Sequence, residues 1–208
     1  MSCCDVNGLN RIFKRNFAET DKRKFLSRGL DKRQEGFLQA FNPEGGSVLD
    51  IGCGVGALGF TALRQGALSC QFVDVSRAYL AAAQNLSKIF DVEDKTVFLQ
   101  GDFVTLETGE ADTVVLDRVV CCYPDATALL TKAAAKSRET LLFSYPVPRW
   151  WLRLGQQLVN SAMKLSRNPY RFHVHDEASL LSAASSAGHK LMNTQRYGIW
   201  QLRTFHKP

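Results

Sequence analysis

The segment with the clearest chemical meaning is a short glycine-rich turn, Gly52-Cys-Gly-Val-Gly-Ala57, which follows the apolar stretch Ser47–Ile51. Glycine at such a turn lets the backbone bend sharply and approach a ligand that a side chain would otherwise block. The positions of Gly52, Gly54 and Ala57 also satisfy the dinucleotide-binding pattern. The glycines therefore predict a ligand-binding turn, but they do not identify the ligand.

An acid just before this turn separates two kinds of ligand. Asp50 stands two residues before the first glycine. A dinucleotide would bring a doubly negative pyrophosphate to the turn, and the carboxylate would repel it. S-adenosylmethionine instead carries an ammonium and a cationic sulfonium, both of which a carboxylate attracts. Asp50 therefore favours S-adenosylmethionine and disfavours an NAD-dependent oxidoreductase.

Two more acids end the next two predicted strands, Asp74 after Gln71-Phe-Val and Asp102 in Leu99-Gln-Gly-Asp. The carboxylate of Asp74 can accept hydrogen bonds from both hydroxyls of a ribose. Asp102 can accept a hydrogen bond from an adenine amino group, while Phe103 lies against the adenine ring. The alternative is that Asp74 and Asp102 only cap helices or turns. Because ligands bind at strand ends in open parallel sheets, three acids there predict one adenosyl site.

Strands alternate with helices from residue 47 to residue 145, which predicts a parallel sheet covered on both faces. Before them, Asp21–Phe41 has helical spacing, as one helix or as two broken near Gly29. After them we expect two helices, Arg149–Leu165 and Glu177–Ala187, and a closing hairpin. The expected strands are Ser47–Ile51, Cys70–Val75, Thr96–Gln100, Thr113–Leu116 and Thr140–Tyr145. The expected helices between them are Gly56–Arg64, one capped by Ser76 that runs to about Phe90, and Asp125–Lys136. The hairpin pairs Lys190–Gln195 with Ile199–Phe205.

The composition fits one domain of 208 residues, 45% hydrophobic and 22% charged. We divide it into a helical cap (1–41), a cofactor-binding core (47–145), a helical lid or substrate element (146–188) and the closing hairpin (189–208).

The sequence lacks a transmembrane-length apolar stretch and a secretory signal, so we expect a cytoplasmic protein with reduced cysteines. The net charge of +6 fits a solvated basic surface, an anionic substrate or an anionic membrane. No basic run is interleaved with aromatic residues, so we expect no nucleic-acid partner. The sequence does not indicate an oligomeric state.

Together these motifs resemble those of the class I S-adenosylmethionine-dependent methyltransferases. The matching segments are Leu49–Gly56, Phe72–Ser76, Gln100–Phe103 and Ala111–Asp117, within about residues 20 to 145. The resemblance implies an α/β, Rossmann-like, doubly wound and mostly parallel sheet of seven strands with an antiparallel last strand. It also implies a methionine end held by Asp50 with Gly52, Gly54 and Gly56, a ribose held by Asp74 and an adenine held by Asp102.

The layout is similar to the branch that contains the ubiquinone-pathway and magnesium-protoporphyrin methyltransferases. Those enzymes often place an acid or a histidine in the stretch that corresponds to Arg118–Asp125, and this sequence has Cys121 and Cys122 there. Their substrates are therefore not carried over. As buried small residues the two cysteines need no function. Alternatively they bind a soft acceptor, a thiol or a trivalent metalloid, and Cys3 and Cys4 form a second pair that could fold over the pocket.

The candidates for acceptor binding and catalysis follow the fourth predicted strand. Methyl transfer mainly requires a nucleophile held about 3–3.5 Å from the methyl group, and a base only when the acceptor arrives protonated. Asp117 is a candidate base. Arg118 pairs with an acidic substrate or, alternatively, with Asp117 or Asp125.

The segment Tyr170-Arg-Phe-His-Val-His175 supplies further candidates. His173 and His175 share one face of an extended backbone, and His175 is the first choice as general base. The alternative is a hydrogen-bonded structural histidine. Arg171 suits a carboxylate or phosphate, with Tyr170 beside it. A third ligand is missing, so no metal site is expected.

The predicted helix from Arg149 to Arg167 is the last candidate element. Trp150, Trp151 and several leucines lie on one arc, and basic residues lie on another. This pattern is typical of a lid over an apolar acceptor, of core packing, or of a helix in peripheral contact with a membrane. Trp150 is included among the acceptor-binding candidates. We expect methyl transfer to a small molecule, with thiol or metalloid methylation, or a catalytically silent cofactor-binding module, as alternatives.

Overall fold

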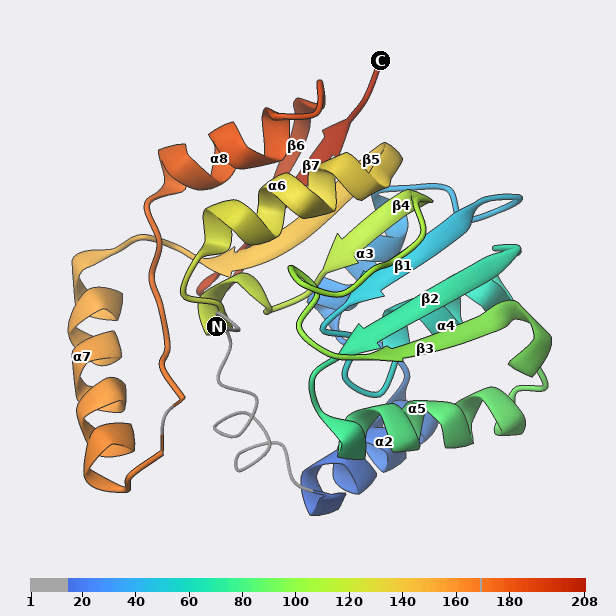
Figure 1. Cartoon of the computed structure of the whole chain (residues 1–208), viewed down its shortest axis with the longest axis horizontal. Coiled ribbons are helices and arrows are strands. Elements are labelled where there is room, and N and C mark those ends of the chain that lie inside the picture. The colour runs from blue at the N-terminus through green and yellow to red at the C-terminus, as the bar shows by residue number, and fades with distance from the viewer. Residues whose placement is uncertain (1–14, 169) are drawn as a thin grey trace.

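The structure is a computed structural model that describes residues 15–168 and 170–208, so Cys3 and Cys4 lie outside the described residues. Its centre is a seven-stranded sheet in the order β3-β2-β1-β4-β5-β7-β6 (Figure 1). The strands β1 to β5 pair with one another in parallel, and β7 is antiparallel to both β5 and β6. The strands are β1 (Ser47–Ile51), β2 (Ser69–Asp74), β3 (Thr96–Gln100), β4 (Ala111–Leu116), β5 (Ser137–Pro146), β6 (Lys190–Tyr197) and β7 (Trp200–His206). The order confirms the predicted Rossmann-like sheet.

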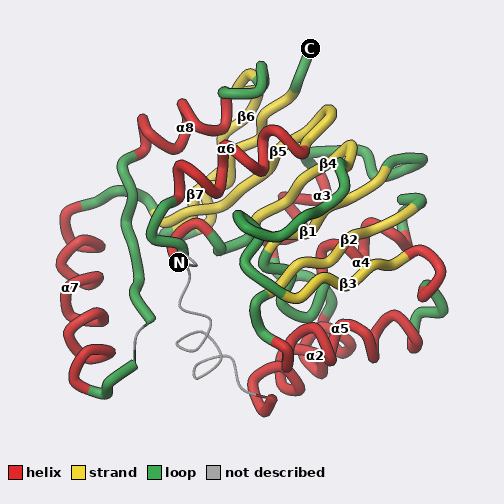
Figure 2. The backbone as a smooth tube through the Cα atoms, viewed as in Figure 1, coloured by secondary structure: helices red, strands yellow, loops and turns green. Residues whose placement is uncertain are grey.

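Helices cover both faces of this sheet, as Figure 2 shows. One apolar layer joins the sheet to α2 (Arg15–Arg28), α3 (Lys32–Gln39), α4 (Ala57–Arg64) and α5 (Arg77–Ile89), with Phe37, Phe60 and Phe72 fully buried in it. The other layer joins it to α6 (Ala126–Lys136) and α8 (Glu177–Ser185). The chain reverses its winding between β1 and β4, so the carboxyl ends of these two strands border the crevice where ligands bind in such sheets.

The N-terminal region forms two helices, which confirms the predicted break near Gly29. Gly29 has a φ of 69° and ends α2, and its N–H donates to the carbonyl of Phe25. Asp31 then caps α3 in a reciprocal capping box with Gln34. β5 is longer than the predicted Thr140–Tyr145, because its pairing with β4 begins at Ser137 and its pairing with β7 extends to Pro146.

The helix α7 (Trp150–Leu165) belongs to neither layer. It stands beside the sheet with the segment that connects it to α8 lying between them (Figure 1). None of the residues of α7, all of which are described, is buried. The interpretation of this helix as core packing is therefore wrong, because its apolar residues do not face the core.

Candidate active site

The glycine turn after β1 has the backbone geometry that its sequence predicts. The φ angles of Gly52, Gly54 and Gly56 are 64°, 56° and 80°, in the left-handed region that favours glycine. The N–H groups of Gly52 and Cys53 both donate to the carbonyl of Val73, at 2.7 and 3.0 Å. This ties the turn to the end of β2. A Cβ atom on Gly52 would lie 2.4 Å from Cγ2 of Val119, so the turn packs closely against the segment after β4.

Alanine substitutions at two of these glycines are expected to have unequal effects. Gly52→Ala should lower the free energy of unfolding by about 2–4 kcal/mol, since left-handed strain adds to a clash with Val119. Gly54→Ala should cost about 1 kcal/mol, because its strain is similar but its nearest neighbour, Tyr79, is 3.5 Å from the new Cβ. Urea unfolding of both variants measures the difference. Equal losses would contradict the close approach of Val119.

Asp50 is a buried carboxyl group at the end of β1. Its side chain is 3% exposed and accepts a hydrogen bond of 3.3 Å from the N–H of Gly59. The pKa of Asp50 is raised to about 7, mainly by burial and also by the negative charges of Asp117 and Asp74, while the Gly59 bond opposes the shift. A carboxylate in this environment is stabilised by a cation placed against it.

Asp74 ends β2, and its carboxylate accepts a hydrogen bond from the glycine turn. The N–H groups of Gly54 and Ser76 donate to its two oxygens, at 2.9 and 2.7 Å. Burial is the main cause that raises the pKa of Asp74, to about 6. The alternative role of Asp74, as a cap of a turn, therefore accounts for some of its hydrogen bonds. However, Asp74 also lines the same cavity as Asp50.

Asp102 has a side-chain partner that sequence reasoning missed. The hydroxyl of Tyr123 donates to Oδ1 of Asp102 at 2.8 Å, and the N–H of Val104 donates to the same oxygen at 3.1 Å. Tyr123 follows the short 3-10 turn η2 (Val120–Cys122) and is 4% exposed. Phe103 is buried too, with the ammonium of Lys132 at 5.2 Å from the centre of its ring. Asp102, Phe103 and Tyr123 all line the cavity.

One cavity of about 600 Å³ joins the predicted cofactor residues to several acceptor candidates. Its volume lies in the ordinary range for small-molecule sites. The acids Asp50, Asp74 and Asp102 line it together with the glycine turn, and residues from α2, α3 and the segment after α7 complete the wall. The acceptor candidates in its lining are Asp117, Arg118, Cys121, Cys122 and Tyr170.

Asp117 is held by Arg33, a partner that the sequence did not indicate. Nε and Nη2 of Arg33 donate to the two oxygens of Asp117 at 2.7 and 2.8 Å, and Oγ of Ser144 donates to Oδ1 at 2.8 Å. Both members of the ion pair are buried, with side-chain exposures of 8% and 9%. Asp117 therefore accepts hydrogen bonds from Arg33 and Ser144, and the ion pair joins α3 to the end of β4.

Arg118 makes a second, longer ion pair with Asp117, as one of the alternatives drawn from the sequence has it. Its Nε atom is 3.9 Å from Asp117, and its side chain is 53% exposed. Its φ of 58° is unusual for a residue with a side chain, and its N–H donates to Oγ of Ser144 at 2.8 Å. Strained backbone of this kind often occurs where a side chain is needed at a site. Arg118 is one of the residues that line the cavity.

The two adjacent cysteines lie at the same wall. Their sulfur atoms are 3.7 Å apart, and Sγ of Cys122 is 3.4 Å from the hydroxyl oxygen of Tyr170. Hydrogen bonding between the thiols raises the pKa of Cys121 and lowers that of Cys122. Cys122 is therefore the thiol of this pair that ionises first.

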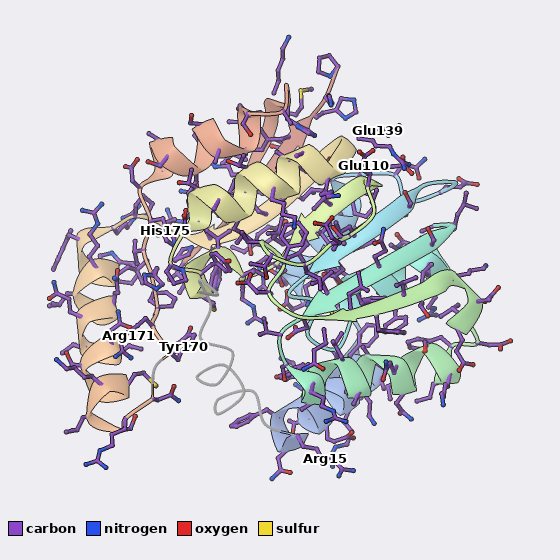
Figure 3. All side chains as sticks on the ribbon, viewed as in Figure 1. Arg15, Glu110, Glu139, Tyr170, Arg171 and His175 are labelled. Atoms are coloured by element: carbon purple, nitrogen blue, oxygen red, sulfur yellow. The ribbon has the colours of Figure 1, made fainter. Side chains whose placement is uncertain are left out.

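The remaining candidates are outside the cavity lining. The Nε2 atom of His175 is 3.0 Å from the carbonyl oxygen of Val120, and the backbone N–H of His173 donates to Cys121. Burial is the main cause that lowers the pKa of both imidazoles. Arg171 donates to two backbone carbonyls, of Asn168 and Tyr170. Trp150 is 77% exposed. Among the described lining residues there is no histidine. Figure 3 shows His175 away from Tyr170, at the other end of the segment that begins at Tyr170.

The comparisons with known proteins agree with this geometry. A family described as "Methyltransferase domain" matches residues 19–192, whereas a comparison with curated proteins gives no match. A magnesium protoporphyrin IX methyltransferase from Synechocystis PCC 6803 with bound SAH has a TM-score of 0.64 at 21% identity, over 95% of this chain and 84% of that one. An S-adenosylmethionine-dependent methyltransferase from Mesorhizobium loti has a TM-score of 0.66 at 15% identity, over 84% and 96%. An O-methyltransferase family protein from Burkholderia thailandensis reaches 0.73 at 15% identity, over 100% of this chain and 64% of that one.

The sheet order, the glycine turn and the acids at the strand ends thus define a Rossmann-like cofactor-binding enzyme. With the family match, which extends over most of its length, the chain belongs to the class I S-adenosylmethionine-dependent methyltransferases. The resemblance inferred from the sequence motifs is confirmed.

Proposed function

We propose that S-adenosylmethionine lies across the ends of β1, β2 and β3, in the 600 Å³ cavity. Asp50 would face the ammonium of its methionine end, Asp74 the ribose hydroxyls and Asp102 the adenine. The observation that supports this placement is a pair of carboxyl groups in the cavity lining, the buried Asp50 and the half-buried Asp74, whose pKa values are raised to about 7 and about 6, mainly by desolvation. A cationic ligand relieves the cost of ionising them.

We propose further that the acceptor is a small molecule with an apolar body and a carboxylate. The guanidinium of Arg118 supplies the cation, and Tyr170 and Phe172 supply apolar surface at the same wall. A carboxylate is ionised at neutral pH and needs no general base. This agrees with a described lining that contains no histidine and with an Asp117 that Arg33 already engages.

When bound, the cofactor supplies a methyl group on a cationic sulfur. The residues of the chain hold the acceptor oxygen in line with that carbon, at about 3–3.5 Å, and exclude water from it. The bond from carbon to sulfur breaks as the bond from carbon to the carboxylate oxygen forms, so the products are a methyl ester and a neutral thioether. No proton moves in this step, and Arg118 acts by orienting the acceptor.

The test is incubation of the protein with a labelled methyl donor and matched panels of aromatic and aliphatic carboxylic acids, phenols, amines, thiols and arsenite. Label on apolar carboxylic acids supports the proposal. Label confined to phenols or amines would sink the choice of a carboxylate. Cofactor binding by calorimetry without turnover on any panel would favour a catalytically silent module.

A thiol or metalloid acceptor is the second candidate, because the sulfur atoms of Cys121 and Cys122 lie 3.7 Å apart in the cavity wall. Two adjacent thiols suit a soft trivalent centre. Label on arsenite or on thiols alone, lost on Cys122→Ser and retained in Cys70→Ser, would support this alternative. Cys70 is a buried cysteine that is absent from the lining.

Arg118→Gln is expected to raise the KM for a carboxylate acceptor at least tenfold, since one charge-assisted pair, worth about 1.5–3 kcal/mol, is lost. The cofactor Kd should change less than about twofold, because the proposal assigns Arg118 to the acceptor and not to the cofactor. Arg138→Gln is the matched control. Its side chain is 54% exposed, and it pairs with Glu110 and Asp112 away from the cavity. Steady-state kinetics with both variants measures the effect, and equal KM values would remove Arg118 from the acceptor site.

A further inference from the structure

The outward face of α7 is apolar and is covered by nothing in the part of the chain that the structure describes. Trp150 is 77% exposed, Leu158 67% and Leu165 88%. Of the fourteen large hydrophobic side chains that are exposed among the described residues, six are on this one helix: Trp150, Trp151, Leu154, Leu158, Val159 and Leu165. Scattered apolar residues are normal on a surface, but a concentration on one face marks an interaction site.

The opposite face of α7 carries two amide side chains that bond to the segment after the helix. Nδ2 of Asn160 donates to the carbonyl of Phe172, and its Oδ1 accepts from the N–H of Phe172, at 2.9 and 2.8 Å. One turn earlier, Oε1 of Gln156 accepts from the N–H of Val174 at 3.1 Å. Residues four apart lie on one side of a helix, so these amides turn the polar side toward the protein. The tryptophans and leucines consequently face outward.

The sequence segment that contains α7 carries charge of one sign. Between Glu139 and Asp176 the sequence contains five basic residues and no acidic one. Arg153 and Lys164 flank the apolar arc on the helix itself, and both are exposed. A helix with tryptophan and leucine on one side and basic residues at the flank is suited to lie in the headgroup region of an anionic bilayer.

We infer that α7 docks this protein on an anionic lipid surface, with its axis along the membrane plane. The helix has 16 residues and is about 24 Å long. No helix in the described residues is long and apolar enough to cross a bilayer. A second copy of the chain fits this face poorly, because a symmetric contact would bring two acid-free basic segments together. Docking would place the cavity-lining residues Tyr170 and Phe172 about one helix diameter from the lipid.

The experiment is co-sedimentation of the full chain with vesicles of phosphatidylcholine alone, or with about one quarter phosphatidylglycerol. It needs neither cofactor nor acceptor, so its outcome is independent of the proposed reaction. We expect binding to the anionic vesicles only, weakened at high salt. The variant Trp150→Ser/Leu154→Ser/Leu158→Ser should reduce binding at least tenfold.

The matched control replaces three residues of similar exposure on other surfaces, Leu68→Ser/Ile89→Ser/Met192→Ser, whose wild-type exposures are 66%, 53% and 67%. This control should bind as the wild type does, and circular dichroism checks that both variants are folded. Three results overturn the inference: a wild-type protein that stays in the supernatant, equal binding by both triple variants, or concentration-dependent self-association that the α7 variant abolishes without any vesicle binding.

Discussion

Asp50→Asn should weaken binding of S-adenosylmethionine about 30- to 100-fold, because the cofactor loses one charge-assisted contact worth about 2–3 kcal/mol. The substitution is conservative for the fold. An amide oxygen can still accept the hydrogen bond from Gly59, so only the charge is removed. Isothermal titration with the cofactor and with its demethylated product measures the change. An unchanged Kd would show that the methionine end lies elsewhere.

The pH dependence of cofactor binding follows from the same carboxyl group. Its pKa in the free protein is about 7, and the ionised form is the one that attracts an ammonium. Affinity should therefore be highest above pH 7 and fall as the pH decreases, by about tenfold or more at pH 5.5. In Asp50→Asn most of this dependence should disappear, leaving the smaller part due to Asp74, whose pKa is about 6. A flat wild-type profile would contradict the assignment.

The stability of the free protein should change in the opposite direction. Asp50 binds its proton more tightly in the folded state than in the unfolded state, so the free energy of unfolding falls as pH rises from about 4 to about 7. Asparagine does not ionise, so it carries no free-energy cost of a buried charge. Asp50→Asn should therefore stabilise the cofactor-free protein at pH 8 by about 1–3 kcal/mol, as measured by urea unfolding.

A second aspartate gives a control of opposite sign. Hydrogen bonds from Ser47 are the main cause that lowers the pKa of Asp112, and Arg138 lowers it further. The stability that Asp112 contributes is present above its unfolded pKa and is lost as the pH falls through the folded value. Asp112→Asn should therefore destabilise the protein at pH 8. If both substitutions destabilised it, burial would not be the cause of the Asp50 shift.

Much of the fold could be predicted because its signals are local. The strands β1 and β3 have the bounds that the apolar stretches predict, and Ser76 caps α5 through the N–H of Tyr79. The glycine turn was also predictable, since its conformation depends on consecutive residues. The acids Asp50, Asp74 and Asp102 could be placed together because parallel strands bring their carboxyl ends to one edge.

The parts of the site that could not be predicted depend on contacts between distant residues. Tyr123 and Asp102 are 21 positions apart, and Arg33 and Asp117 are 84 apart. The predicted break near Gly29 indicated that a second helix would follow, but not what the side chain of Arg33 would meet. For His175, the alternation with His173 predicted a shared face. It did not reveal that the carbonyl of Val120 would lie at Nε2, outside the cavity.

Arg33→Met is expected to have the largest effect on stability, lowering the free energy of unfolding by about 3–5 kcal/mol. The substitution leaves the carboxylate of Asp117, 9% exposed, with the hydroxyl of Ser144 but without its bidentate partner. It also releases α3 from the end of β4. Urea unfolding measures the loss.

The double variant Arg33→Met/Asp117→Asn separates a structural pair from a catalytic base. Without the buried charge, the penalty for an unpaired carboxylate vanishes, and at least half of the lost stability should return. If Asp117 serves only to join α3 to β4, turnover should recover with stability, because Arg118 and the cofactor residues are unchanged. Recovery of stability without turnover would instead assign proton transfer to Asp117, and the acceptor would then be one that arrives protonated.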